Sequence, residues 1–158
     1  MEGWKAMKKI VLVVAALLMV CVLAACNETV KEADLNAVLA DIEKNVTLLE
    51  MMNLTADNLS DYGIDASDAK QFVFKIDKSG IKADEVAMFE AKDADAAARI
   101  KEKLEAHLTE RANQFNNYLP EQYAVIEQCS VETYGNYVTL FVSPDASKMI
   151  EIFESYVQ

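Results

Sequence analysis

The sequence contains a single histidine, His107. That scarcity excludes a His-rich metal site and a histidine pair, and any triad of nucleophile, histidine and carboxylate would have to use this one residue. His107 lies between Lys103 and Arg111 at helical spacing, and no plausible serine nucleophile stands near it in the chain. We therefore interpret His107 as a surface or boundary residue of a helix.

Cysteine and positive charge are also scarce. Of the three cysteines, Cys21 and Cys26 stand near the N-terminus, which leaves Cys129 without an intrachain partner and excludes a disulfide framework. Cys129 is interpreted as a small apolar residue of a strand. Fifteen basic residues face 26 acidic ones, so the chain carries a net charge of −11. A polyanion is repelled by nucleic acid, and nucleic-acid binding is not expected.

The N-terminus has the pattern of an export signal. Lys8 and Lys9 precede the segment 10–25, whose 16 residues include no charge, proline or glycine. As a helix this segment would span roughly 24 Å at about 1.5 Å per residue, short of a hydrocarbon core of about 30 Å. Such a segment suits the export machinery better than a permanent span. Because Met7 precedes the two lysines directly, the true start is either Met1 or Met7.

The segment ends in Leu23-Ala24-Ala25-Cys26, which resembles the lipobox of bacterial lipoproteins. In that family the cysteine thiol receives diacylglycerol and the bond before it, here Ala25–Cys26, is cleaved. The resemblance implies a fatty-acylated Cys26 that holds the protein on the outer face of the cytoplasmic membrane, since two acyl chains anchor stably. The alternative is an uncleaved signal anchor.

The chain therefore divides into a signal peptide (1–25), a lipidated tether (26–30) and a single domain (31–158). Removal of the signal takes away three lysines and one glutamate, which leaves 12 basic and 25 acidic residues and a net charge of −13. The remaining length suits one domain with a proper core.

Hydrophobic periodicity predicts an α+β domain. The expected order is helix, two strands, helix, two strands, helix, which favours a four-stranded antiparallel sheet with helices layered on one face. The first helix is expected to begin with a capping box at 29–32 and to run to about 50, followed by a loop at 53–68 and strands at 71–76 and 84–91. A long helix capped by Asp93 should run to about 118 and be ended by Pro120. Strands at 125–133 and 137–143 and a final helix capped by Ser143 complete the domain.

Two acidic groups were weighed as sites. The four acids in the loop 57–68, namely Asp57, Asp61, Asp65 and Asp68, depart from an EF-hand because Leu59 occupies a ligand position and the closing glutamate is missing. Helix caps and a solvated loop are the favoured interpretation, with a weak cation site as the alternative.

Paired carboxylates for acid–base chemistry are the second possibility, at Asp84-Glu85 and at Asp93 with Asp95. Strand-edge solubility and helix capping explain these pairs more simply. The sequence therefore gives no catalytic, metal-binding or cofactor-binding set.

Four sets of residues stand out together: Tyr62-Gly63-Ile64-Asp65, Ala83-Asp84-Glu85-Val86-Ala87, Arg111 with Gln114-Phe115 and Tyr118-Leu119-Pro120, and Gly135-Asn136-Tyr137-Val138 leading to Ser143. In this order they are similar to a family of small lipoproteins known as the domain of unknown function 4358. The resemblance covers roughly Leu35 to the C-terminus and implies a lipid-anchored envelope domain without an assigned activity.

From these runs Tyr62, Asp65, Arg111 and Tyr118 are candidate ligand-binding or structural residues. The structural interpretation pairs Arg111 with a carboxylate and places Tyr118 as a plug at the helix end.

Three functions compete. The leading hypothesis is a non-enzymatic envelope module that binds a protein or a small ligand beside the membrane. The second is a cation- or solute-binding accessory protein of a transporter, and the third is a hydrolase that uses a carboxylate pair. The expected partners are the lipid bilayer, through diacylglyceryl Cys26, and an unidentified envelope protein or small ligand.

Overall fold

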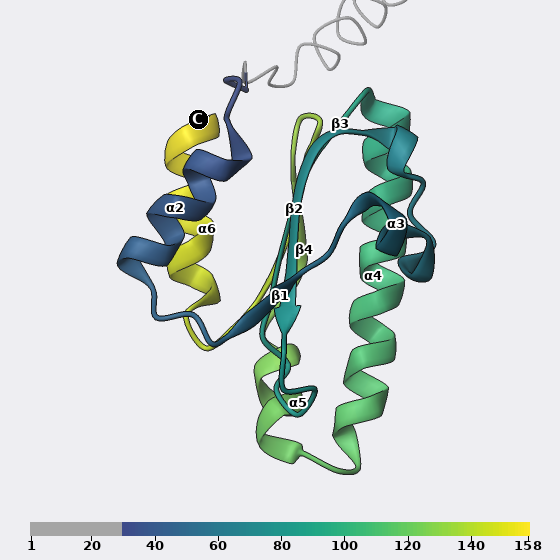
Figure 1. Ribbon diagram of the computed structural model, residues 1–158, viewed down its shortest axis with the longest axis vertical. Helices are drawn as coiled ribbons and strands as arrows, with labels where there is room; N and C mark the ends of the chain where they lie inside the picture. The colour runs from purple at the N-terminus through teal and green to yellow at the C-terminus, as the bar shows by residue number, and fades with distance from the viewer. Residues whose placement is uncertain (1–29) are drawn as a thin grey trace, which may run out of the picture.

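The computed structural model describes residues 30–158, which form one antiparallel sheet with helices on both of its faces (Figure 1). Within these residues the order of elements is α2 (Leu35–Asn45), β1 (Met51–Asn53), α3 (Ala56–Leu59), η2 (Ser60–Tyr62), η3 (Ala66–Asp68), β2 (Ala69–Asp77), β3 (Glu85–Ala91), α4 (Ala94–Asn116), α5 (Pro120–Ile126), β4 (Val131–Tyr134), β5 (Tyr137–Val142) and α6 (Ala146–Val157). The α+β class and the antiparallel sheet are confirmed.

The sheet has five strands in the order β1-β2-β3-β5-β4, so the prediction of four strands was wrong. The extra strand is β1, which pairs with the end of β2 and forms one edge. β2 and β3 pair in the register Phe72↔Phe89 and Phe74↔Ala87, and β3 also pairs with β5. Gly135 closes the β4–β5 hairpin at φ +57°, a backbone angle that glycine adopts readily.

Both faces of the sheet are covered, which corrects the prediction that helices lie on one face only. Phe74, Ala87 and Phe89 belong to a core that packs under α4, together with α3 and α5. Val86 and Met88 belong to a second core, with α2 and α6. Adjacent residues of β3 are therefore apolar and buried on opposite sides, as expected of a strand without a solvent-facing side.

Several predicted boundaries also move. The first helix begins at Leu35, where the Asp34 side chain accepts a hydrogen bond from the Asn36 amide, and it ends at Asn45 rather than near 50. Thr29 of the predicted capping box lies outside the described residues. The final helix begins at Ala146 with Asp145 at its N-cap instead of Ser143, whose hydroxyl accepts a hydrogen bond from the Asp145 amide.

The long helix α4 is capped by Asp93 as predicted, through a side-chain hydrogen bond from the Ala96 amide, and it ends at Asn116. Pro120 then occupies the first turn of the short helix α5, where its fixed φ and missing N–H are tolerated. Helix α5 replaces the beginning of the strand predicted at 125–133, so that β4 starts only at Val131. The predicted loop at 53–68 contains α3 and two 3-10 turns.

None of the helices within residues 30–158 is long and apolar enough to cross a bilayer. The signal segment 1–25, the lipobox and Cys26 lie outside the described residues, so their predicted roles stay predictions.

Candidate functional site

The structure brings two of the four candidate residues into one pocket. Tyr62, at the end of η2, and Arg111, on α4, line a hollow of about 410 Å³ between the edge strand β1 and the C-terminal half of α4. Asp65 lies in a different pocket, and Tyr118 lies in the connection between α4 and α5 with 84% of its surface exposed. The prediction that Tyr118 plugs the helix end was therefore wrong.

The pocket combines an apolar side with a polar rim. β1, β2 and the segment between β1 and α3 supply apolar side chains, whereas α3, η2 and α4 supply amides, acids, a phenol, an imidazole and a guanidinium. The complete lining is Met52, Leu54, Asn58, Asp61, Tyr62, Ile76, His107, Glu110, Arg111 and Gln114. Such a lining suits a small ligand with both an apolar part and hydrogen-bonding or charged groups.

A buried, hydrogen-bonded pair of a glutamate and a histidine lies at one side of this pocket. Glu85, the first residue of β3, points to the α4 side of the sheet, and its side chain is only 1% exposed. Its Oε2 lies 2.9 Å from Nε2 of His107, whose side chain is 14% exposed. The other carboxylate oxygen, Oε1, has no hydrogen-bond partner among the described protein atoms. A partnerless buried oxygen is unfavourable by about 1–3 kcal/mol, which makes it a feature that needs an explanation.

Tyr62, from η2, packs against the Glu85–His107 pair. Its ring packs edge-on against His107, with 4.9 Å between ring centroids, and lies 4.7 Å from the Phe74 ring. Burial raises the pKa of Tyr62, and the negative charge of Glu85 raises it further. The phenol is therefore a neutral hydroxyl at physiological pH, able to donate one hydrogen bond and to accept others. Gly63, in the left-handed region at φ +68°, ends η2 directly after it.

Arg111 is fixed by other groups than the predicted carboxylate. Its Nη2 donates a hydrogen bond to the Lys82 carbonyl at 3.1 Å, and its guanidinium carbon lies 4.7 Å from the centroid of the Phe115 ring. These contacts hold the guanidinium beside the pocket and use one of its five N–H groups, so the others remain available to a ligand.

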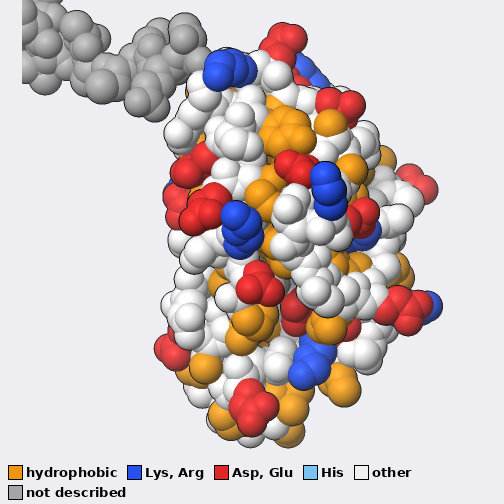
Figure 2. Space-filling view, turned by 90° about the vertical axis from the view of Figure 1, so that its left-hand side faces the viewer, with side chains coloured by type: hydrophobic (Ala, Val, Ile, Leu, Met, Phe, Trp, Pro, Cys, Tyr) orange, Lys and Arg blue, Asp and Glu red, His pale blue; other side chains and the backbone are white. Residues whose placement is uncertain are grey.

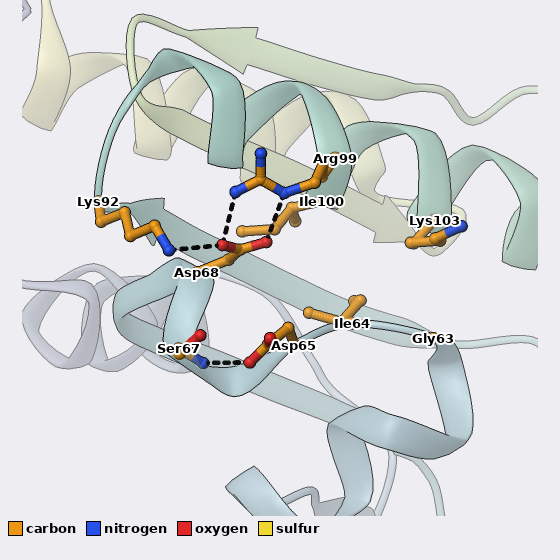
Figure 3. Close-up of a pocket in the computed structure, with 9 residues that line it drawn as sticks. All are labelled: Gly63, Ile64, Asp65, Ser67, Asp68, Lys92, Arg99, Ile100 and Lys103. Atoms are coloured by element: carbon orange, nitrogen blue, oxygen red, sulfur yellow. Dashed lines mark hydrogen bonds and ion pairs between the residues drawn. The ribbon is translucent and has the colours of Figure 1, made fainter.

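The second pocket, of about 380 Å³, is dominated by an internal ion bridge (Figure 3). Arg99 donates to both oxygens of Asp68, at 2.8 and 2.7 Å, and Lys92 adds a third contact at 2.8 Å. The Arg99 hydrogen bonds hold the pKa of Asp68 well below its usual range, with Lys92 as the next cause. Asp65 caps η3 by accepting a hydrogen bond from the Ser67 amide. This cluster ties η3 to α4, and its charges satisfy one another.

The acidic loop 57–68 does not form a single cation site, and Asp84 and Glu85 do not act as a carboxylate pair. Asp61 lines the first pocket, whereas Asp65 and Asp68 line the second, so the loop 57–68 does not gather its acids around one cation. Within residues 30–158 no three His, Cys, Asp or Glu side chains are placed to hold a metal ion. Glu85 pairs with His107 instead of acting with its neighbour Asp84.

Sequence reasoning missed the Glu85–His107 pair because its members stand 22 positions apart on different elements. Two signals were present in the sequence. Glu85 is an acid at the start of a largely apolar strand, and His107 lies three residues after Leu104 and directly before Leu108, two apolar positions that face the core and its margin. Neither signal indicates the partner, because only the packing of α4 across β3 brings the two side chains together.

A family model described as a domain of unknown function, DUF4358, matches residues 44–143. The match runs from the end of α2 to the residue after β5, and it includes both pockets and the buried pair. No curated protein and no solved structure matches the chain. Since the family model covers well over half of the sequence, this chain belongs to the DUF4358 family.

Proposed function

We propose that the protein is a lipid-anchored, extracytoplasmic binding module, and that the pocket beside Glu85 and His107 holds a small solute with a cationic group. The observation that carries the ligand site is the buried carboxylate of Glu85 next to the pocket-lining His107, with one oxygen unpartnered. A buried carboxylate with an unpartnered oxygen destabilises the fold, so its presence indicates a functional role for this group.

The charges of the pocket support the choice of ligand. Asp61 and Glu110 on the rim outnumber the single guanidinium of Arg111. In a half-buried site these carboxylates attract a positive group, and the face of Tyr62 offers a π-surface to it. Met52 and Ile76 suit an apolar portion of the same molecule.

The same lining favours binding over hydrolysis. No serine, threonine or cysteine lines this pocket of the described domain, so His107 has no side-chain nucleophile to activate there. The acids on the rim belong to two different elements, with Asp61 in η2 and Glu110 in α4. Binding and release of a solute need none of these groups to react.

The anchor is supported by the sequence Leu23-Ala24-Ala25-Cys26 at the end of an apolar export segment. Mass spectrometry of the N-terminal peptide from cell membranes tests it. We expect a peptide that begins at Cys26 and carries a diacylglyceryl group, and a Cys26→Ser variant that keeps its leader and gains no lipid mass. An intact leader, or a new terminus without added lipid mass, contradicts the anchor.

The ligand site is tested by calorimetry with a panel of primary amines, quaternary ammonium ions and basic amino acids. We expect at least one class to bind at millimolar concentration or below, and Asp61→Asn to weaken it about fivefold, the effect of roughly 1 kcal/mol at 25 °C. Asp57→Asn is the matched control, because Asp57 is an exposed acid of α3 that does not line the pocket. Absence of binding across the panel at millimolar concentration refutes the cationic ligand.

A further inference from the structure

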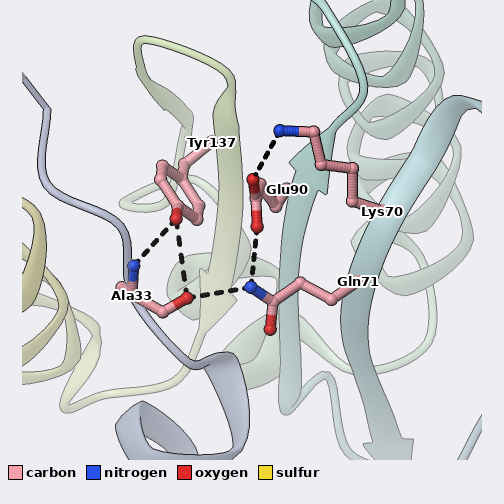
Figure 4. A network of polar contacts seen from close by, with 5 residues as sticks. All are labelled: Ala33, Lys70, Gln71, Glu90 and Tyr137. Carbon is pink, nitrogen blue, oxygen red and sulfur yellow. Dashed lines mark hydrogen bonds and ion pairs between the residues drawn. The ribbon is translucent and has the colours of Figure 1, made fainter.

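The segment that leads into α2 is fastened to the sheet instead of hanging free. The Ala33 amide donates a hydrogen bond to the hydroxyl of Tyr137 at 2.9 Å, and the Ala33 carbonyl accepts one from Nε2 of Gln71 at 2.9 Å (Figure 4). The Oε1 atom of Gln71 also accepts a hydrogen bond from the Leu35 amide at 3.1 Å. Glu90 holds Gln71 in place by accepting from Nε2 at 2.7 Å.

The attachment continues to the first described residue. The Lys31 amide donates to the carbonyl of Val157 at the end of α6. A β-carbon at Gly135 would lie 3.0 Å from a methyl group of Val30, so the β4–β5 turn and Val30 are in close contact. The stretch 26–30 was predicted to be a tether, but its last residue is part of the folded domain.

This docking shortens the tether to almost nothing. Only Asn27, Glu28 and Thr29 separate Cys26 from Val30. Four residue steps reach at most about 14 Å when fully extended, at 3.3–3.6 Å per residue. If Cys26 carries the acyl chains, Val30 and the β4–β5 turn cannot move further than this from the lipid headgroups.

The docked segment also marks one end of the domain. Val30 and Ala33 contact the β4–β5 turn and Tyr137, beside the end of β3, where the Ala91 amide donates to the Asn136 carbonyl. The opposite end carries the β2–β3 turn, where the Ala83 amide donates to the side chain of Gln122 in α5. β3 runs between the two ends and spans about 20 Å, at about 3.3 Å per residue over seven residues.

We infer that the end of the domain around the β4–β5 turn, called here the tether end, lies against the surface of the bilayer, with the β2–β3 turn and α5 pointing away. This inference rests on the proposed acyl anchor at Cys26. The partner it commits to is the headgroup layer of the membrane.

Charge does not decide this orientation. Exposed cations lie at or near the tether end, but Lys70 pairs with Glu90, and Lys92 and Arg99 both pair with Asp68. On the long side formed by α2 and α6, acidic and basic side chains are also interspersed (Figure 2). The orientation is therefore carried by the short tether and by the docked segment.

The orientation sets the place of the ligand pocket. Along α4 the pocket begins at His107, which is 14 residues after the Asp93 cap at the tether end. At about 1.5 Å per residue the pocket is held roughly 21 Å along the helix from that end. A solute therefore enters above the headgroup layer instead of between the domain and the lipid.

Energy transfer to headgroup-labelled lipid tests the orientation with the acylated full-length protein in vesicles of phosphatidylcholine and phosphatidylglycerol. One fluorophore is placed at Asn136→Cys in the β4–β5 turn, or at Ile81→Cys in the exposed β2–β3 turn, with Cys129→Ser in both proteins. We expect transfer from position 136 to be several times more efficient than from position 81. Equal transfer, or stronger transfer from position 81, overturns the inference.

Two further variants test whether the short tether and the docked segment cause this orientation. A Gly/Ser insertion between Glu28 and Thr29 lengthens the tether, and Tyr137→Phe removes the hydroxyl that holds the Ala33 amide. Both should reduce the difference between the two positions. Tyr134→Phe is the matched control, since its hydroxyl donates to Glu154 instead, and the difference should persist. An unchanged difference in the insertion variant overturns the role of the short tether.

The two proposals fail in distinguishable ways. Missing lipid mass on the N-terminal peptide refutes the anchor itself. Correct lipid mass with equal transfer from both positions leaves the anchor intact and refutes the orientation alone.

Discussion

Replacement of His107 by leucine is expected to destabilise the domain through Glu85. Within residues 30–158 the imidazole is the only hydrogen-bond partner of the Glu85 carboxylate, whose side chain is 1% exposed and already has one unpartnered oxygen. Leucine has a similar volume and packs against Tyr62 and Phe74, so the loss of packing is small. The main effect is that a buried carboxylate is left without any partner.

The magnitude follows from the burial of the pair. Loss of one member of a buried ion pair is unfavourable by about 3–5 kcal/mol, and a buried group without a hydrogen bond by about 1–3 kcal/mol. Because the His107 side chain is 14% exposed and the Glu85 side chain is enclosed, we expect a loss near the overlap of these ranges, about 3 kcal/mol. For a domain of this size that corresponds to a fall in Tm of roughly 10 °C.

Urea unfolding followed by circular dichroism measures the effect in a double-mutant cycle. Glu85→Met added to His107→Leu should restore most of the lost free energy of unfolding, since an apolar pair of similar volume often equals a buried ion pair. Thr109→Leu, at an exposed position of the same helix, is the control and should change stability by less than about 0.5 kcal/mol. A His107→Leu effect as small as the control, or no recovery in the double variant, refutes the coupling between the two residues.

Three further predictions concern other parts of the domain. Because Arg99 lowers the pKa of Asp68 in the folded state, the Asp68 carboxylate stabilises the fold above its unfolded pKa of about 3.9. This contribution is lost as the pH falls toward the lower pKa of the folded state. Asp68→Asn should therefore be less stable than wild type at pH 7, and the difference between their urea midpoints should narrow in acid. Gly135→Ala should be more destabilising than Gly80→Ala. Both glycines have positive φ, at which alanine is less stable by about 1 kcal/mol, but only at Gly135 would a β-carbon lie 3.0 Å from the docked segment. Equal losses of stability contradict that contact. Burial raises the pKa of Cys129, so the folded protein should react with iodoacetamide far more slowly than the urea-unfolded chain at the same pH, and similar rates would show that the thiol is accessible.

The elements with clear periodicity were predicted well, and the layer arrangement was not. β2, β3, β5 and α4 lie close to their predicted ranges, because alternating or helical apolar positions continue over enough residues. β1 was missed, since three residues are too few for a period to show. The two-sided cover was readable in principle, because apolar residues occupy adjacent positions along most of β3 and β5.

The site was predictable only in part. Tyr62 and Arg111 were selected one by one from runs shared with a family, and the fold places them in the same pocket. Asp65 and Tyr118 came from the same runs but have a local role or lie exposed. His107 was placed at the surface or boundary of a helix by its charged neighbours along the chain, whereas its partner Glu85 comes from the sheet beneath. A local window along the chain cannot contain such a pairing.

The edges of the sheet matter for a protein tied to a surface. Anchored chains diffuse in two dimensions at high local density, where an open strand of one molecule readily meets that of another. Here both outer strands are short, three residues in β1 and four in β4, and they offer few free amides and carbonyls for pairing between molecules. β1 covers only Lys75–Asp77 of the nine-residue β2, so residues 69–73 of β2 have no strand partner on that side among the described residues. If the proposed anchor crowds these molecules on a membrane, that stretch of β2 is where pairing between two sheets would begin.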